Sequence, residues 1–128
     1  MTRKNITYGQ PLEQEIGFSR AVKIDNLIAI SGTAPIAPDG SVASVGDVYG
    51  QTRHCLEIIR DVIEQAGGNL EGVIRTRIML TNMNTWMEAA KAHGEIFSAI
   101  QPACTFVEVS RFINPDWLVE IEADAVVE

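Results

Sequence analysis

The sequence has few of the features that mark several common classes of protein. Its two cysteines, Cys55 and Cys104, lie far apart with no CxxC or Cys/His ligand spacing, so neither a zinc site nor a disulfide framework is predicted. The 10 Lys and Arg residues are outnumbered by 17 Asp and Glu residues, giving a formal net charge of -7. Binding to nucleic acid phosphates needs clustered basic side chains, and no such cluster is present. We expect no metal, no cofactor and no nucleic acid partner.

Long apolar runs are also missing. No stretch approaches the roughly 18 apolar residues of a transmembrane helix, and the opening MTRKNITYGQPLEQE lacks the apolar segment of a signal peptide. Reduced thiols suit a reducing compartment. We therefore expect a cytoplasmic protein without membrane contact. Its 128 residues, 46% of them apolar, predict a single domain spanning residues 1–128.

Alternation of apolar and polar residues predicts five strands. Residues 18–24 and 27–32 form a pair joined by a tight turn at Asp25 and Asn26, which both tolerate a positive φ. Residues 73–81, 105–110 and 119–127 alternate in the same way. The first fifteen residues are polar and predicted to be irregular, and residues 33–46 are rich in Pro, Gly and Ser and are predicted to be a loop.

Two helices are predicted from the 3.6-residue period. Asp47 can cap the first, which carries an apolar stripe as far as Ala66 and ends at Gly67 and Gly68. The second begins with a capping box from Thr85 to Glu88, and Pro102 ends it. Strands and helices in this order predict an α+β fold with two helices on one face of a mixed sheet.

The other sheet face is predicted to be charged and uncovered. If the apolar residues of strand 73–81 face the helices, Arg75 and Arg77 turn to the same side as Glu120, Glu122 and Asp124 of the last strand. Three carboxylates on one strand repel one another unless water or cations lie opposite them. We expect cross-strand ion pairs there, and an identical subunit as the partner that covers the face.

The C-terminal part of the sequence resembles that of a known family. PACTFVEVSRFINPDWLVEIEADAV resembles the C-terminal signature of the YjgF/Rid family of reactive-intermediate imine deaminases, often called endoribonuclease L-PSP, and the match extends upstream through GFSRAV, LIAISGTAP and residues 74–84. The resemblance implies a YjgF-like (chorismate-mutase-like) α+β fold: a mixed six-stranded sheet with two helices packed on one face. It also implies a homotrimer whose ligand clefts, lying between neighbouring subunits, take a small-molecule metabolite.

One position departs from the imine deaminase pattern. The resemblance implies that an arginine after the Pro-Ala of the signature binds the substrate carboxylate, and here that position is Cys104. A thiol cannot replace a guanidinium, which forms two parallel hydrogen bonds to a carboxylate, and losing such a pair costs about 2 to 5 kcal/mol. The standard 2-iminobutanoate/2-iminopropanoate activity is therefore not expected. Arg20 is the first candidate for a substitute cation and Arg77 the second, each with a surface or interface salt bridge as the alternative.

The resemblance assigns roles to other residues that do match. Glu120 corresponds to the glutamate that positions the hydrolytic water, with an ion pair to Arg75 or Arg77 as the structural alternative. Phe18 stands where a tyrosine often covers the ligand, and it can pack there but cannot donate a hydrogen bond. Gly32 corresponds to a glycine whose backbone lines the cleft. Glu120 is the catalytic candidate, and the other two are candidates for ligand binding.

Phe106 and Cys104 are both even-numbered residues of one strand, so they are expected on the same face and in the same ligand-binding region. Cys104 could also act as a nucleophile, with His93 as its base if the end of the second helix lies nearby. The alternatives are a small, partly buried thiol and a hydrogen-bonded core histidine.

Three functions follow, in decreasing order of support. The first is hydrolysis of a C–N bond in an imine or enamine at the inter-subunit cleft. The second is a trimer that binds a small carbonyl compound or acid without turnover, which the missing arginine and tyrosine hydroxyl favour. The third, an endoribonuclease, is opposed by the acidic charge.

Overall fold

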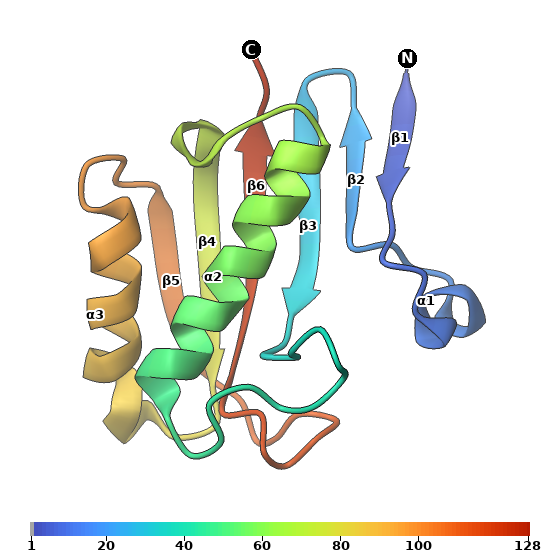
Figure 1. Cartoon of the computed structure of the whole chain (residues 1–128). Coiled ribbons are helices and arrows are strands. Elements are labelled where there is room, and N and C mark those ends of the chain that lie inside the picture. Colours follow the sequence, from blue (N-terminus) through green and yellow to red (C-terminus); the bar gives the residue numbers. More distant parts are fainter. Residues whose placement is uncertain (1) are drawn as a thin grey trace.

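A six-stranded mixed sheet carries two long helices on one of its faces in the computed structural model, which describes residues 2–128 (Figure 1). The strands are β1 (Arg3–Ile6), β2 (Ala21–Ile24), β3 (Leu27–Thr33), β4 (Val73–Leu80), β5 (Ala103–Glu108) and β6 (Val119–Val126). The helices are α1 (Pro11–Ile16), α2 (Val48–Gln65) and α3 (Trp86–Phe97), with short 3₁₀ turns at Leu70–Gly72 and Met83–Thr85. The α+β fold and its six-stranded sheet are as predicted.

The strand order across the sheet is β1-β2-β3-β6-β4-β5. Neighbouring strands are antiparallel except for β4 and β5, which run parallel. The last strand of the sequence therefore lies near the centre of the sheet, and β5 forms one edge. The predicted turn between β2 and β3 is confirmed, and Asp25 has the positive φ of 53° expected of a tight hairpin.

The core lies between the sheet and helices α2 and α3. Alternate residues of β6 are fully buried against it, namely Val119, Ile121, Ala123 and Ala125. The apolar stripe predicted for α2 supplies the facing layer, including Leu56, Ile59, Val62 and Ile63. Because alternate residues of a strand point to opposite faces, the acidic residues of β6 turn to the face without helices.

The prediction for the first fifteen residues was wrong, because they contain strand β1 and helix α1. Strand β1 pairs with β2 at the sheet edge, and only Ile6 of its four residues is buried, so its sequence lacks the apolar alternation of a core strand. Helix α1 begins at Pro11 and ends at Gly17, whose φ is 88°. Its buried Glu13 accepts hydrogen bonds from the backbone N–H groups of Tyr8 and Gln10.

Both long helices begin where predicted, but only the cap of α2 forms as predicted. The Asp47 side chain accepts a hydrogen bond from the N–H of Gly50, as an N-cap residue does. Helix α2 ends at Gln65, two residues before Gly67. The capping box at Thr85 was wrong. The Thr85 hydroxyl instead donates to the carbonyl of Asn82, because a 3₁₀ turn leads into α3 and satisfies that end of the helix.

The charged face opposite the helices was predicted correctly. Arg77 of β4 lies directly across from Glu122 of β6. Its Nη1 is 3.3 Å from Glu122 Oε1 and 3.4 Å from Asp124 Oδ2. Arg77 is thus engaged by two carboxylates, and Glu122 is the structural partner of an arginine.

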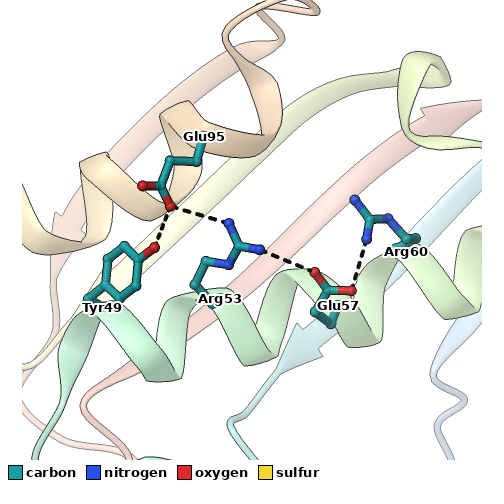
Figure 2. A network of polar contacts seen from close by, with 5 residues as sticks. All are labelled: Tyr49, Arg53, Glu57, Arg60 and Glu95. Carbon is teal, nitrogen blue, oxygen red and sulfur yellow. Dashed lines mark hydrogen bonds and ion pairs between the residues drawn. The ribbon is translucent and has the colours of Figure 1, made fainter.

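A second polar network joins α2 to α3 on the outer surface (Figure 2). Glu95 of α3 accepts hydrogen bonds from Tyr49 and Arg53 of α2, and Arg53 also lies 3.9 Å from Glu57. Arg60 pairs with Glu57 at 2.9 Å, three residues before it. These side chains are exposed, so water and salt screen the ion pairs and they add little to stability.

Candidate functional site

Glu120 is a half-buried carboxylate on the sheet face without helices, as are Glu122 and Asp124. Glu120 lies on β6 opposite Met79 of β4, between two residues whose side chains are fully buried in the core. Burial raises the pKa of Glu120 above its ordinary value, Arg20 opposes this by favouring the charged form, and Glu122 adds to it by repulsion. No hydrogen bond from the described residues contributes to that pKa. Glu120 is therefore a base of raised proton affinity whose oxygens are available.

Gly32 lies against this carboxylate on the neighbouring strand. The pairing of β3 with β6 is irregular between Ile30 and Thr33, where the register shifts. A Cβ on Gly32 would lie only 3.3 Å from Glu120 Oε1. The missing side chain therefore leaves room beside the carboxylate that any other residue would take up.

Arg20 approaches from the start of β2. Its Nη2 donates a hydrogen bond of 2.9 Å to the carbonyl oxygen of Gly32, and its guanidinium carbon lies 5.6 Å from the centroid of the Phe18 ring, within the range of a cation–π contact. Burial lowers the pKa of Arg20, while the negative charges of Glu13 and Glu120 act in the opposite direction. Phe18, Arg20, Gly32 and Glu120 therefore form one group, which we call the Glu120 cluster.

The other two predicted site residues lie elsewhere in the protomer. Cys104 and Phe106 are on β5, directly across from Thr76 and Ile78 of β4, whose side chains are buried on the helix face. Phe106 makes an edge-to-face contact with Trp86 of α3, with ring centroids 5.9 Å apart. Strand β4 lies between β5 and β6, and the side chains of Cys104 and Phe106 are on the helix face of the sheet, whereas Glu120 is on the face without helices. Within one chain, Cys104 and Phe106 therefore do not reach the Glu120 cluster.

His93 behaves as a core histidine. Its Nε2 is 2.9 Å from the Thr76 hydroxyl, and its ring packs on Phe97 with centroids 4.7 Å apart. Burial lowers the pKa of His93, which keeps the ring neutral. No hydrogen bond or aromatic contact of the described residues joins the His93 ring to the exposed Cys104. The geometry therefore gives no support to His93 as a base for Cys104.

The segment that contains Tyr8 and Glu13 was not predicted to contribute to the site. The Tyr8 hydroxyl donates a hydrogen bond of 2.6 Å to Asp61 of α2, and burial together with Asp61 raises the pKa of Tyr8. This contact holds the chain before α1 against α2, and it places Tyr8 and Glu13 close enough to Arg20 to influence its charge. The pattern of Pro11 followed by Gly17 was the available signal for a short helix here.

Comparison with known proteins identifies the family. The model of the endoribonuclease L-PSP family matches residues 9–127. The chain belongs to this family. It is 36% identical over 126 residues to a RutC family protein of Pyrococcus horikoshii, covering 98% of this chain and 99% of that one. It is also 36% identical over 105 residues to the 3-aminoacrylate deaminase RutC of Acinetobacter baylyi, covering 82% of each chain.

Solved structures of the L-PSP (YjgF/Rid) family share the fold. Rv2704 of Mycobacterium tuberculosis, described as a member of the YjgF/YER057c/UK114 family, superimposes with a TM-score of 0.89 at 39% identity, covering 98% of this chain and 100% of that chain. The YjgF gene product of E. coli gives a TM-score of 0.80 at 27% identity, covering 97% and 94%. The mixed sheet with its two helices is thus the fold of this YjgF/Rid chain as well.

The described residues 2–128 have no metal-ligand group and no helix that could span a membrane, and they have a surface hollow. They contain no group of three His, Cys, Asp or Glu residues arranged to hold a metal ion, and no helix among them is long and apolar enough to cross a membrane. A surface hollow of about 380 Å³ lies between the turn after α2 and the C-terminus, lined by Gly68, Gly72 and Val126 among others. It does not include the Glu120 cluster.

Gln51 of this YjgF/Rid chain fixes the loop that leads into β6. It is fully buried in α2, where its Nε2 donates to the carbonyl of Asp116 at 2.9 Å and its Oε1 accepts from the N–H of Leu118 at 2.8 Å. Glu120 follows two residues later. The buried amide therefore sets the path of the chain into the strand that carries the candidate base.

We expect Gln51→Leu to destabilise the protein by about 1 to 3 kcal/mol, because two part-buried hydrogen bonds to backbone groups are lost. Urea unfolding followed by circular dichroism measures the change. Gln65→Leu is the matched control, since Gln65 is an exposed residue of the same helix, and its effect should stay within about 0.5 kcal/mol. Equal effects of the two substitutions would contradict the role given to Gln51.

Proposed function

We propose that this chain forms a homotrimer that hydrolyses a C–N bond of an imine or enamine in a small metabolite, at clefts between neighbouring subunits, with Glu120 as the general base. The family supports the reaction class, because a relative 36% identical to this chain carries the name 3-aminoacrylate deaminase. The observation that carries the proposal is the half-buried Glu120, with its raised pKa and open oxygens beside the bare backbone of Gly32.

The chemistry requires one base that takes up a proton and later releases it. Glu120 removes a proton from water as the water oxygen adds to the carbon of the C=N group. The proton then goes to the nitrogen, which gives a carbinolamine. The hydroxyl proton of the carbinolamine follows the same route through Glu120 to the nitrogen, so that the C–N bond breaks, ammonia leaves and a carbonyl forms. Burial suits this role, since a raised pKa makes the carboxylate a stronger base and its protonated form a usable acid at moderate pH.

The sheet geometry supports assembly through the face without helices. That face carries Glu120 and Arg77, and β5 is an edge strand with five of its six residues exposed. Exposed strand edges are pairing sites that proteins cover or blunt. A neighbouring subunit at this edge would bring Cys104 and Phe106 of one protomer toward the Glu120 cluster of the next, which one chain alone does not do.

The test uses imines generated in the reaction vessel by an amino-acid oxidase, with semicarbazide present to trap imine that has not been hydrolysed. We expect the wild type to lower the yield of trapped product, and Cys104→Arg to lower it further for 2-imino acids because it restores a cation at the position of the family's arginine. No acceleration by either protein across a panel of imines would overturn the proposed hydrolysis.

A second function is favoured by Cys104 and Phe18, which lack the cation and the hydroxyl of the imine deaminases. In that case the cleft binds a small carbonyl compound or acid without turnover. A ligand that raises the melting temperature while no product forms would identify this function. RNA cleavage finds no support in a chain of net charge -7.

A further inference from the structure

Two residues of β3, Ser31 and Gly32, lie where its pairing with β6 is irregular, and we call them the Ser31–Gly32 segment. The register is regular up to Ile30 and resumes at Thr33, so it gives neither residue of the segment a partner on β6. Gly32 lies beside the candidate base, because a Cβ at this position would be 3.3 Å from Glu120 Oε1. The position of this segment therefore determines the surroundings of Glu120, and pairing with β6 alone does not fix it.

Arg20 and the residue before it hold the Ser31–Gly32 segment from the side of β2. The backbone N–H of Ser31 donates a hydrogen bond of 3.0 Å to the carbonyl oxygen of Arg20, and the Ser31 hydroxyl donates one of 2.6 Å to the carbonyl oxygen of Ser19. Nη2 of Arg20 donates one of 2.9 Å to the carbonyl oxygen of Gly32. Arg20 thus bonds both residues of the segment, one through its backbone and the other through its guanidinium.

The guanidinium of Arg20 is packed within the fold. Its carbon lies 5.6 Å from the centroid of the Phe18 ring, and its Nε is buried without a hydrogen-bond partner among residues 2–128. The ion pairs of the described residues do not include Arg20. The side chain therefore acts on its surroundings through the hydrogen bond to Gly32 and through its positive charge.

Charged and titratable groups from several elements act on Glu120. Arg20 favours its charged form, whereas burial and the neighbouring Glu122 of β6 favour the neutral form. Cys55 of α2 is also close enough to interact with Glu120, but burial raises the pKa of its thiol and keeps it neutral. Met79, opposite Glu120 on β4, carries no charge. Arg20 is therefore the positive group of the described residues that opposes the effect of burial on Glu120.

The positive charge of Arg20 persists although the side chain is packed in the fold. Burial lowers the pKa of Arg20, and Glu13 of α1 opposes this most strongly, followed by Tyr8. An arginine starts from so high a pKa that it stays protonated in proteins. The charge of Arg20 is therefore constant over the pH range in which a carboxyl group titrates.

We propose that Arg20 is a positioning residue for the base: it holds the Ser31–Gly32 segment beside Glu120 and keeps a positive charge there, without contacting the substrate. The inference rests on the proposed function and deepens it by naming a residue that sets the state of the base. Direct binding of substrate by Arg20 fits less well, because its Nε is buried and its Nη2 is bonded to Gly32. Loss of the Arg20 charge should raise the pKa of Glu120, since burial and Glu122 then act without opposition.

The first measurement follows the Glu120 carboxyl carbon by carbon-13 NMR as the pH is changed, which needs no substrate. Arg20→Met removes the charge and the hydrogen bond to Gly32, and we expect it to move the Glu120 titration to higher pH. Arg20→Lys keeps the charge and should restore a titration close to that of the wild type. Arg75→Gln is the matched control, since Arg75 is an exposed arginine of β4 that does not contribute to the pKa of Glu120, and it should leave the titration unchanged.

Hydrogen exchange of the Ser31 backbone N–H measures how firmly the Ser31–Gly32 segment is held. The exchange should be at least about tenfold faster in Arg20→Met than in the wild type, because Gly32 loses its hydrogen bond from a charged donor. Should Arg20→Met not fold, nitrogen-15 spectra of the wild-type guanidinium decide. Separate Nη signals show a group whose rotation is blocked by its hydrogen bond, and averaged signals overturn the inference.

An unmoved Glu120 titration in Arg20→Met, or unchanged exchange of the Ser31 N–H, also overturns the inference. Kinetics separate it from direct binding of substrate. A positioning residue shifts the pH below which kcat/KM falls and leaves KM at higher pH unchanged, whereas a raised KM with an unmoved pH dependence would overturn it. The proposed hydrolysis fails separately: a moved titration without turnover of any imine refutes the hydrolysis alone, and turnover with an unmoved titration refutes the role of Arg20 alone.

Discussion

Glu120→Gln lowers kcat/KM for imine hydrolysis by about 10² to 10⁴-fold, the range typical of a lost general base. Glutamine keeps the shape of the side chain and still fits beside Gly32, but it cannot accept a proton from water. The substitution should leave the fold intact, since Glu120 receives no hydrogen bond that contributes to its pKa from the described residues. Initial rates on the best imine of the panel, with circular dichroism as a check of folding, measure the effect.

The pH dependence gives a second test of the same role. Burial raises the pKa of Glu120 above the ordinary 4.5, so the basic form of the carboxylate predominates only above that raised value. The kcat/KM of the wild type should therefore fall as the pH is lowered through the raised pKa, and this acidic limb should be absent from Glu120→Gln. Glu122→Gln is the control, because Glu122 raises the pKa of Glu120 by repulsion. Its acidic limb should move to lower pH while activity above the limb remains.

Stability should change in the direction opposite to activity. The raised pKa means that the folded protein binds the Glu120 proton more tightly than the unfolded chain does. This stabilising contribution is complete below the unfolded pKa and is lost as the pH rises through the folded pKa. Glu120→Gln should therefore melt higher than the wild type at neutral pH, and the difference should shrink in acid. A variant that is active, or that melts lower at neutral pH, would contradict the assignment of Glu120.

The regular parts of the fold could be predicted because their patterns are local. Alternation in residues 73–81 and 119–127 was enough to place Arg77 and Glu122 on the face without helices, and the two are in contact. The edge strand β1 could not be predicted in the same way. Only Ile6 of its residues is buried, so its position depends on backbone pairing with β2, which leaves no apolar signature.

The candidate site could be predicted only in part, because it depends on the strand order. Cys104 and Glu120 are close in sequence, yet β4 is inserted between their strands and their side chains lie on opposite faces. Arg20 is 100 positions from Glu120 but belongs to the same cluster, since β3 pairs with β6 and brings Gly32 beside it. Pairings between distant segments follow from packing of the whole sheet, which local patterns do not encode.

Gly72→Ala destabilises the protein by about 2 to 4 kcal/mol. Gly72 ends the 3₁₀ turn before β4, and a Cβ there would lie 2.2 Å from the carbonyl oxygen of Val126. The added Cβ would meet the backbone of β6 near the end of that strand. Backbone atoms, unlike a side chain, cannot rotate away from the contact. Relief requires either β4 or the end of β6 to move, and both belong to the central part of the sheet. Urea unfolding measures the loss.

Gly94→Ala is the matched control, and it should act in the opposite direction. Gly94 lies within α3, and no atom is within 4 Å of the position of its added Cβ, so the substitution should stabilise the protein by about 0.5 to 1 kcal/mol through helix propensity. Both changes are from glycine to alanine and reduce the freedom of the unfolded chain to the same extent. The difference between the two variants therefore reports on the folded state alone. Equal free energies of unfolding for Gly72→Ala and Gly94→Ala would show that the backbone of β6 shifts at Val126 without cost. The close approach of Gly72 to Val126 would then not contribute to the stability of the central strands.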